Sequence, residues 1–182
     1  MAKIDVFLAT GFEECEALLV VDICRRAGLD LKMVSITGEY EVTSSHGVCV
    51  KADLLFDEVD FEAVDMLVLP GGMPGTTNLE AFEPLMKQVE AFYEKGKCIS
   101  AICAAPSILG HRGFLNGRNA ASYPSFESHL EGARVSHNSV EVSEHVTTSR
   151  GLGTAIDFGL AIVERFMGKD EAEKIAKAIV YR

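Results

Sequence analysis

The chain has 182 residues, of which 48% are hydrophobic and 24% are charged. These proportions are typical of a globular protein and exclude a disordered, collagen-like or disulfide-stapled chain. There are 17 basic and 27 acidic residues, a formal net charge of -10. No cluster of Lys and Arg rises above that background, so we expect neither nucleic acid nor an anionic membrane as a partner. At roughly 100 to 200 residues per domain, the length predicts a single domain over residues 1–182.

The five cysteines are an odd number, so at least one thiol is free. They show no CxxC pair and no zinc-ligand spacing, which indicates a reducing, cytoplasmic compartment and no metal site. The N-terminal segment lacks the apolar region and small-residue cleavage site of a secretory signal. The apolar stretches are too short to span a membrane.

Strand and helix patterns alternate along the chain. Continuous apolar runs that end at Gly or Pro indicate buried strands, and apolar positions three or four residues apart indicate helices. In chain order, these patterns predict a strand over Lys3–Ala9, a helix over Glu14–Ala27, a strand over Leu31–Ile36, a small antiparallel excursion formed by Tyr40–Thr43 and Val48–Ala52, a strand over Met66–Leu69, a helix over Leu85–Phe92, a strand over Cys98–Ile102, a helix over Ala104–His111, short strands over Asn119–Ser122 and Val146–Ser149, and helices over Thr154–Phe166 and Glu171–Val180. The alternation predicts an α/β fold, with a mostly parallel sheet covered by helices on both faces.

Three of the predicted strands end in unusual residues. These segments are Gly11-Phe12-Glu13-Glu14-Cys15-Glu16, Pro70-Gly71-Gly72-Met73-Pro74-Gly75 and Ala101-Ile102-Cys103-Ala104-Ala105-Pro106. Ligands of open α/β sheets bind outside the carboxyl ends of the strands, so the three segments are candidates for one site.

Cys103 lies between a buried strand and a helix, at a sharp turn that resembles a nucleophile elbow. A thiol at this point faces the helix N-terminus, whose N–H groups and dipole favour the thiolate. The alternative is that Cys103 is a small buried hydrophobic residue, the commonest fate of a free cysteine.

The other two segments allow a functional and a structural interpretation each. Gly71 and Gly72 can offer backbone N–H groups to an oxyanion, or they form an ordinary tight turn. Glu16 can be desolvated and protonated, and so exchange a proton with a thiol or a substrate. Its neighbours Glu13 and Glu14 fit the usual role of solvated acids in a first helical turn, and that role is open to Glu16 as well.

Together the three strand ends resemble the DJ-one branch of the ThiJ/PfpI superfamily. The resemblance runs nearly end to end and includes a fourth motif, Thr148-Ser149-Arg150-Gly151-Leu152-Gly153-Thr154. It implies a flavodoxin-like three-layer sandwich, usually a homodimer. It also implies that Cys103 is an oxidisable nucleophile, that Glu16 is its protonated partner, and that Gly71 and Gly72 lie beside the sulfur.

The resemblance implies a cofactor-free glyoxalase that converts methylglyoxal to lactate, or a deglycase that acts on early glycation adducts. The alternative that it implies is a redox sensor or chaperone that works through oxidation of Cys103. Older names in the superfamily refer to thiazole biosynthesis and to intracellular proteases. A small α-oxoaldehyde or a glycated molecule is therefore the expected substrate.

The chain departs from the family pattern at two positions near the nucleophile. Tyr123, before Pro124, stands where many branch members carry a His, and Ala104 stands where the peptidase-like members carry a His. Without either imidazole there is no Cys-His dyad, so a peptidase is disfavoured. We expect Ala104 and Tyr123 to border the substrate. Leu152 is a smaller departure, because relatives often have Pro in that loop.

Two further expectations concern ligands and partners. The segment Gly151–Ile156 lacks the third Gly of a dinucleotide fingerprint, and the five His residues show no metal-ligand grouping, so we expect neither NAD nor a metal. In relatives the first helix and the antiparallel excursion pack across a dimer interface. Here that would involve Arg25, Arg26 and His46, with Cys15 and Cys49 near the seam. The remaining cysteines, Cys24 and Cys98, are assigned to packing.

Overall fold

A computed structural model describes residues 1–181 of the chain. Within these residues the main sheet has seven strands in the order β10-β11-β7-β6-β1-β2-β5. Their bounds are β1 Lys3–Leu8, β2 Asp30–Ser35, β5 Leu54–Leu55, β6 Met66–Leu69, β7 Cys98–Ile102, β10 Val140–Ser143 and β11 Val146–Ser149. Every neighbouring pair is parallel except β10 with β11. The predicted mostly parallel sheet is therefore confirmed.

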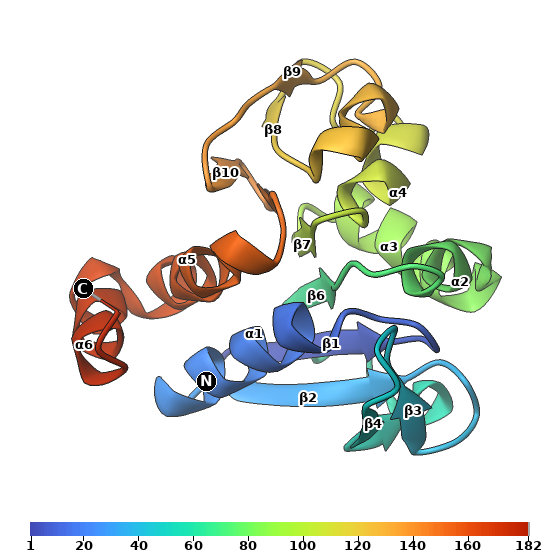
Figure 1. Cartoon of the computed structure of the whole chain (residues 1–182), viewed down its shortest axis with the longest axis horizontal. Helices are drawn as coiled ribbons and strands as arrows, with labels where there is room; N and C mark the ends of the chain where they lie inside the picture. Colours follow the sequence, from blue (N-terminus) through green and yellow to red (C-terminus); the bar gives the residue numbers. More distant parts are fainter. Residues whose placement is uncertain (182) are drawn as a thin grey trace.

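Helices cover both faces of this sheet (Figure 1). On one face lie α1 (Glu14–Arg26) and α5 (Ala155–Met167), with α6 (Lys169–Ala178) packed against α5. The opposite face carries α2 (Gly75–Ala81), α3 (Glu83–Glu94) and α4 (Pro106–His111). The side chains of β1 alternate between two cores, since Val6 packs with the α1 and α5 side and Phe7 with the other. The result is the α/β fold that the sequence patterns predict, in the form of the three-layer, flavodoxin-like sandwich that the family resemblance implies.

Two small sheets lie outside the main one. Strands β3 (Glu41–Thr43) and β4 (Cys49–Lys51) form the predicted antiparallel excursion. Strands β8 (Asn119–Ala120) and β9 (Arg134–Val135) pair in parallel. Short 3-10 segments complete the chain: η1 Phe56–Glu58, η2 Pro124–His129 and η3 Leu152–Thr154.

The structure differs from the sequence prediction mainly in short elements. Helix α2, strands β5, β9 and β10, and the 3-10 segments were not predicted, and the helix expected from Ala104 begins at Pro106. Helix α2 depends on long-range contacts. Gly75 lies so close to Phe12 that an added Cβ would be 2.6 Å from the Phe12 Cα atom, and its N–H donates to the Gly11 carbonyl. The spacing of apolar residues within a segment cannot predict such long-range contacts, so this helix was missed.

The strand order places a switch point beside β1. The chain runs from β1 outward to β2 and then returns to the other side of β1 to form β6 and β7. At such a point the loops at the carboxyl ends of neighbouring strands diverge and leave room for a ligand. The loops that follow β1, β6, β7 and β11 meet at this edge, and they contain the four motifs of the sequence.

Candidate functional site

Cys103 stands at the tight turn that follows β7. Its φ is +65°, in the left-handed region that a residue with a side chain seldom adopts. Neighbouring loops hold this conformation: the Cys103 N–H donates to the Ser149 carbonyl (3.0 Å), and the Tyr123 N–H donates to the Cys103 carbonyl (2.8 Å). The turn places Cys103, a half-exposed residue, at the carboxyl edge of the sheet, which agrees with the predicted elbow.

Glu16 reaches the same point from the first turn of α1. The Glu13 side chain caps this helix by accepting the Glu16 N–H (2.6 Å), and the Glu13 N–H donates to the Gly71 carbonyl (2.9 Å). These bonds fix the start of α1 against the loop after β6. The Glu16 side chain is then only 1% exposed, so it is not one of the solvated first-turn acids.

Backbone N–H groups surround both the sulfur and the carboxyl group. The Gly71 N–H donates to Glu16 Oε2 (3.0 Å), and the Leu152 N–H also donates to this carboxyl group. The N–H groups of Gly72 and Ala104 donate to the Cys103 sulfur. The predicted Gly71 and Gly72 pair is thus divided between the two side chains, and Ala104 supplies the second donor to the sulfur.

Gly71 leaves the space in which the two side chains meet. A Cβ added there would lie 2.6 Å from both the Cys103 Cβ and Glu16 Oε2. Gly72 has a φ of +91°, and a Cβ on it would strike the backbone of Phe12 and Glu13. The two glycines are therefore required by the close approach of neighbouring atoms.

Burial is the main cause of the shifted pKa values of Glu16 and Cys103. It raises the pKa of Glu16 to about 7, against which the hydrogen bond from Cys103 acts. Burial also raises the pKa of the Cys103 thiol to about 12, and the negative charge of Glu16 contributes in the same direction. The expected resting thiolate is thus not supported, because α4 begins three residues beyond Cys103 and no cation faces the sulfur in the described part of the chain.

The fully protonated pair carries two protons, and it loses the first of them at a pH of about 7. Removal of that proton leaves either an ionised Glu16 beside a thiol or a protonated Glu16 beside a thiolate, and the two forms interconvert by proton transfer. The first form predominates, while the second is the nucleophilic one. Glu16 therefore has the position of a general base for Cys103.

The rim of the site contains Tyr123 and the loop after β11. A Cβ added at Gly151 would lie 3.6 Å from Tyr123 Cδ2 and 3.8 Å from Cys103 Sγ. The Tyr123 side chain is thus close to the sulfur and half-exposed, whereas Ala104 is buried and contributes its N–H. The Leu152 N–H and the position of Gly151 were not predicted as parts of the site, since a backbone donor leaves no side-chain signal in a sequence.

The other four cysteines are free thiols, as Cys103 is. Cys24 is buried and Cys98 half-buried, which fits packing roles. Cys15 and Cys49 are exposed on this chain. One group of side chains within residues 1–181 has ligand atoms close enough to hold a metal ion, namely Glu13, Glu14 and His46. The sequence did not predict this grouping, and one Glu13 oxygen already caps α1.

The sequence and the fold both resemble those of known proteins. Residues 2–165 match the DJ-1/PfpI family. The chain belongs to the DJ-1/PfpI family. It is 34% identical over 182 residues to "Protein DJ-1 homolog B" of Arabidopsis thaliana, covering 99% of this chain but 42% of that protein, so the chain spans less than half the length of this relative.

Two further DJ-1/PfpI members are informative. "Glutathione-independent glyoxalase DJR-1.2" of Caenorhabditis elegans is 29% identical over 92% of this chain and 89% of its own length. The solved structure "Toxoplasma gondii DJ-1, oxidized" superposes with a TM-score of 0.95 at 36% identity and covers 100% of this chain and 99% of that one. Among the described residues, no helix has both the length and the apolar character needed to cross a membrane.

Proposed function

We propose that this DJ-1/PfpI protein is a cysteine-dependent glyoxalase that converts methylglyoxal to lactate without a cofactor, and that it also accepts early glycation adducts. The observation that carries the proposal is the contact between the Cys103 thiol and a buried, proton-accepting Glu16, with two backbone N–H groups on the sulfur. A family member named as a glutathione-independent glyoxalase supports it.

The chemistry needs a nucleophile, one proton carrier and water. As the sulfur adds to the aldehyde carbon, the thiol proton passes to Glu16, and the new oxyanion takes hydrogen bonds from the Gly72 and Ala104 N–H groups. Glu16 then protonates this oxygen to give a hemithioacetal. It next removes the proton from C1 and returns it to C2 through an enediol, which leaves a thioester. Water hydrolyses the thioester to the hydroxy acid and the free thiol. One carbon is oxidised as its neighbour is reduced, so no external oxidant takes part.

The test measures lactate formed from methylglyoxal by the purified protein in the absence of glutathione. We expect Cys103→Ala to abolish the activity and Glu16→Gln to lower it by at least 100-fold, on the order of a lost general base. Cys49→Ala, which removes an exposed thiol on β4, is the matched control and retains activity. Lactate formation that persists in Cys103→Ala rejects the proposal.

A second candidate function is a redox sensor or chaperone, and the half-exposed state of Cys103 favours it. Peroxide would convert the thiolate to sulfenic and then sulfinic acid, whose oxygens would accept from the N–H groups around the sulfur. Intact mass after mild peroxide treatment tests this function. It predicts added oxygen on Cys103, whereas oxidation confined to Cys15 and Cys49 argues against it.

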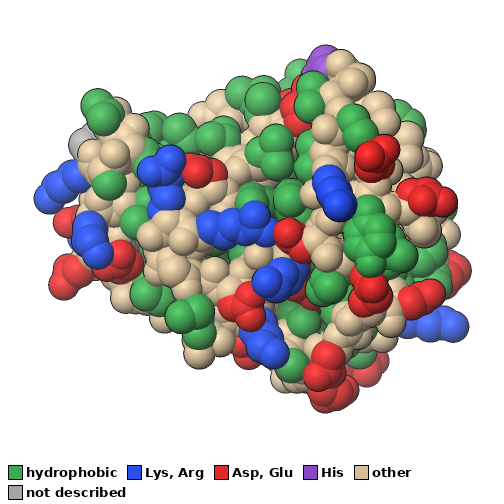
Figure 2. Space-filling view, turned by 90° about the horizontal axis from the view of Figure 1, so that it is seen from below, with side chains coloured by type: hydrophobic (Ala, Val, Ile, Leu, Met, Phe, Trp, Pro, Cys, Tyr) green, Lys and Arg blue, Asp and Glu red, His purple; other side chains and the backbone are tan. Residues whose placement is uncertain are grey.

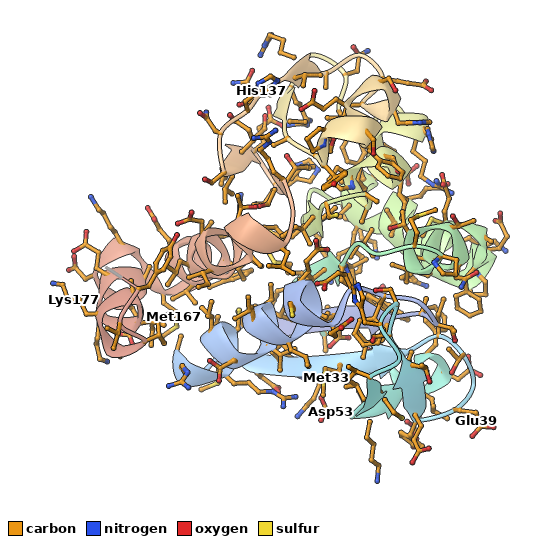
Figure 3. The ribbon with its side chains drawn as sticks, viewed as in Figure 1. Met33, Glu39, Asp53, His137, Met167 and Lys177 are labelled. Atoms are coloured by element: carbon orange, nitrogen blue, oxygen red, sulfur yellow. The ribbon has the colours of Figure 1, made fainter. Side chains whose placement is uncertain are left out.

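We also propose that the chain is a cytoplasmic homodimer. The surface concerned comprises α1 and the β3–β4 hairpin. Two hydrogen bonds, from the Gly11 N–H to the Thr43 carbonyl and from the Ser45 N–H to the Phe12 carbonyl, attach this hairpin to the loop that precedes α1. At the far end of this surface Asp53 lies beside Met33 (Figure 3) and accepts its N–H and a hydrogen bond from Arg25. Light scattering at micromolar concentration should give twice the 19.7 kDa chain mass. A monomeric mass contradicts the proposal.

A further inference from the structure

Asp5 is a buried acid in the middle of β1. The residue is 3% exposed, and its Oδ2 atom has no hydrogen-bond partner in the described chain. Side chains two residues apart in a strand share a face, so Asp5 lies on the face of Phe7, whose ring packs against Phe56 and Phe61. The carboxyl group is therefore covered by the segment 56–64, and not by α1.

A hollow of about 190 Å³ lies above this carboxyl group. Its charged walls comprise Asp5, Asp30, Glu58 and Asp60, together with Lys3 and Lys32. Since a water molecule in the liquid takes up roughly 30 Å³, the hollow has room for a molecule of several heavy atoms. Leu54, Val59 and Val64 supply aliphatic surface on the remaining walls.

The two lysines do not neutralise the buried acid. Lys32 Nζ lies 3.4 Å from Asp30 Oδ1, and neither Lys32 nor Lys3 forms an ion pair with Asp5 in the described residues. Four carboxyl groups then face two ammonium groups. An ionised carboxylate only accepts hydrogen bonds, so a ligand of Asp5 must donate them. The excess of acidic over basic groups around the hollow favours a donor with a positive charge.

A metal ion does not fit this arrangement. The single group of His, Cys, Asp and Glu side chains in residues 1–181 whose ligand atoms converge within 4.8 Å is that of Glu13, Glu14 and His46, and none of these lines the hollow. We propose that the hollow binds a small alkylammonium ion, with its ammonium group on Asp5 and its methylene groups against the aliphatic wall.

The hollow and the Cys103 site lie at opposite ends of the strands. Lys3 and Asp5 are in the first half of β1, and Asp30 and Lys32 are in the first half of β2, so all four lie toward the amino ends of the strands. Cys103 lies at the carboxyl ends of the strands. The alkylammonium site is thus independent of the proposed glyoxalase activity, and either one can fail without the other.

Titration of Asp5 gives the site a pH dependence. Burial raises the pKa of Asp5 to about 6, and the charge of Asp30 adds to the rise, whereas Lys32 and Lys3 oppose it. Glu58 and Asp60 face the hollow from the covering segment. Because the ammonium ion binds the ionised carboxylate, affinity should increase about tenfold per pH unit below about 6 and then level off.

The test is isothermal titration calorimetry of the full chain with 1,4-diaminobutane, n-butylamine and butan-1-ol. We expect saturable binding of one amine per chain and no binding of butan-1-ol, which has the same alkyl length without the charge. Asp5→Asn should weaken amine binding at least tenfold, while Asp22→Asn, at an exposed acid on α1, is the matched control. Cys103→Ala should bind the amines as the wild type does.

Any one of three results would contradict the proposed alkylammonium site. They are unchanged affinity in Asp5→Asn, equal binding of butan-1-ol and the amines, and no binding of any probe, in which case the hollow holds water only. If Asp5→Asn does not fold, the pH series on the wild-type protein decides, because amine affinity that does not change between pH 4.5 and 6 excludes Asp5 as the acceptor.

Discussion

Close packing around the Cys103 and Glu16 side chains limits which residues can occupy the neighbouring positions. Gly71, Gly72 and Gly151 surround the contact between Cys103 and Glu16. The two side chains were predictable because a thiol after a strand and an acid inside a helical turn leave signals in a sequence. The donors were harder to find, since the N–H groups of Ala104 and Leu152 belong to backbone whose position depends on loop geometry.

Gly71→Ala should damage both the pair and the fold. The new methyl group would lie 2.6 Å from Cys103 Cβ and Glu16 Oε2, and forced overpacking of this kind costs about 1–3 kcal/mol. Urea unfolding measures the cost, and alkylation of Cys103 reports the displaced sulfur. Gly153→Ala is the matched control, because a Cβ there meets nothing within 4 Å. Equal stability of the two variants would refute the crowding argument.

Glu16 should make the protein less stable as the pH rises. Its pKa is about 7 in the folded chain against an ordinary value of 4.5, so the folded state binds more protons than the unfolded state between these values. The free energy of unfolding that Glu16 contributes is fully present below about pH 4.5 and is lost as the pH rises through 7, by up to about 1.4 kcal/mol per unit.

Glu16→Gln removes this dependence. Urea unfolding of both proteins from pH 4.5 to 8 should show that the variant gains stability relative to the wild type as the pH increases. Asp5 also has a raised pKa but remains in both proteins, so the difference between them isolates Glu16. A stability difference that does not vary with pH would show that folding does not raise the pKa of Glu16.

At the scale of elements, long apolar runs were predictable and short elements were not. Strands β1, β6 and β7 lie in the middle of the sheet and consist mostly of buried residues, the majority of them apolar. Short apolar runs of this kind are typical of buried strands. Helix α2 has the sequence GTTNLEA, which has weak helix formers and a single buried leucine. Its formation depends on the contact of Gly75 with Phe12, which lies 63 positions earlier.

The packing of α1 on α5 holds Glu16 in place. Ile23 is 1% exposed, and a Cβ added at Gly159 of α5 would lie 3.0 Å from its Cδ1 atom. Ile23→Ala should therefore lower the free energy of unfolding by about 2–5 kcal/mol through the cavity that it leaves. Asp22→Ala, on the exposed side of α1, should change it by less than about 0.5 kcal/mol. Thermal or urea unfolding decides between these values.

At the scale of the whole molecule, charge limits the partners. The chain has a net charge of -10, and Figure 2 shows basic and acidic side chains interspersed on the face that it displays. From this charge we expect no electrostatic driving force for binding the phosphate backbones of nucleic acid. Fluorescence anisotropy with a labelled DNA duplex at low salt should show no binding, and salt-sensitive binding at micromolar protein would contradict this expectation.

The strongest test of the account measures the rate of Cys103 alkylation by iodoacetamide against pH, in the wild type and in Glu16→Gln. The wild-type rate should rise until the pair has lost the first of its two protons, at a pH of about 7, and then stay level over several pH units while Glu16 and Cys103 share the remaining proton. The variant has only the thiol to titrate, so its rate should continue to rise above pH 9. Two identical profiles that both bend near the ordinary thiol value of ~8.5 would contradict the account.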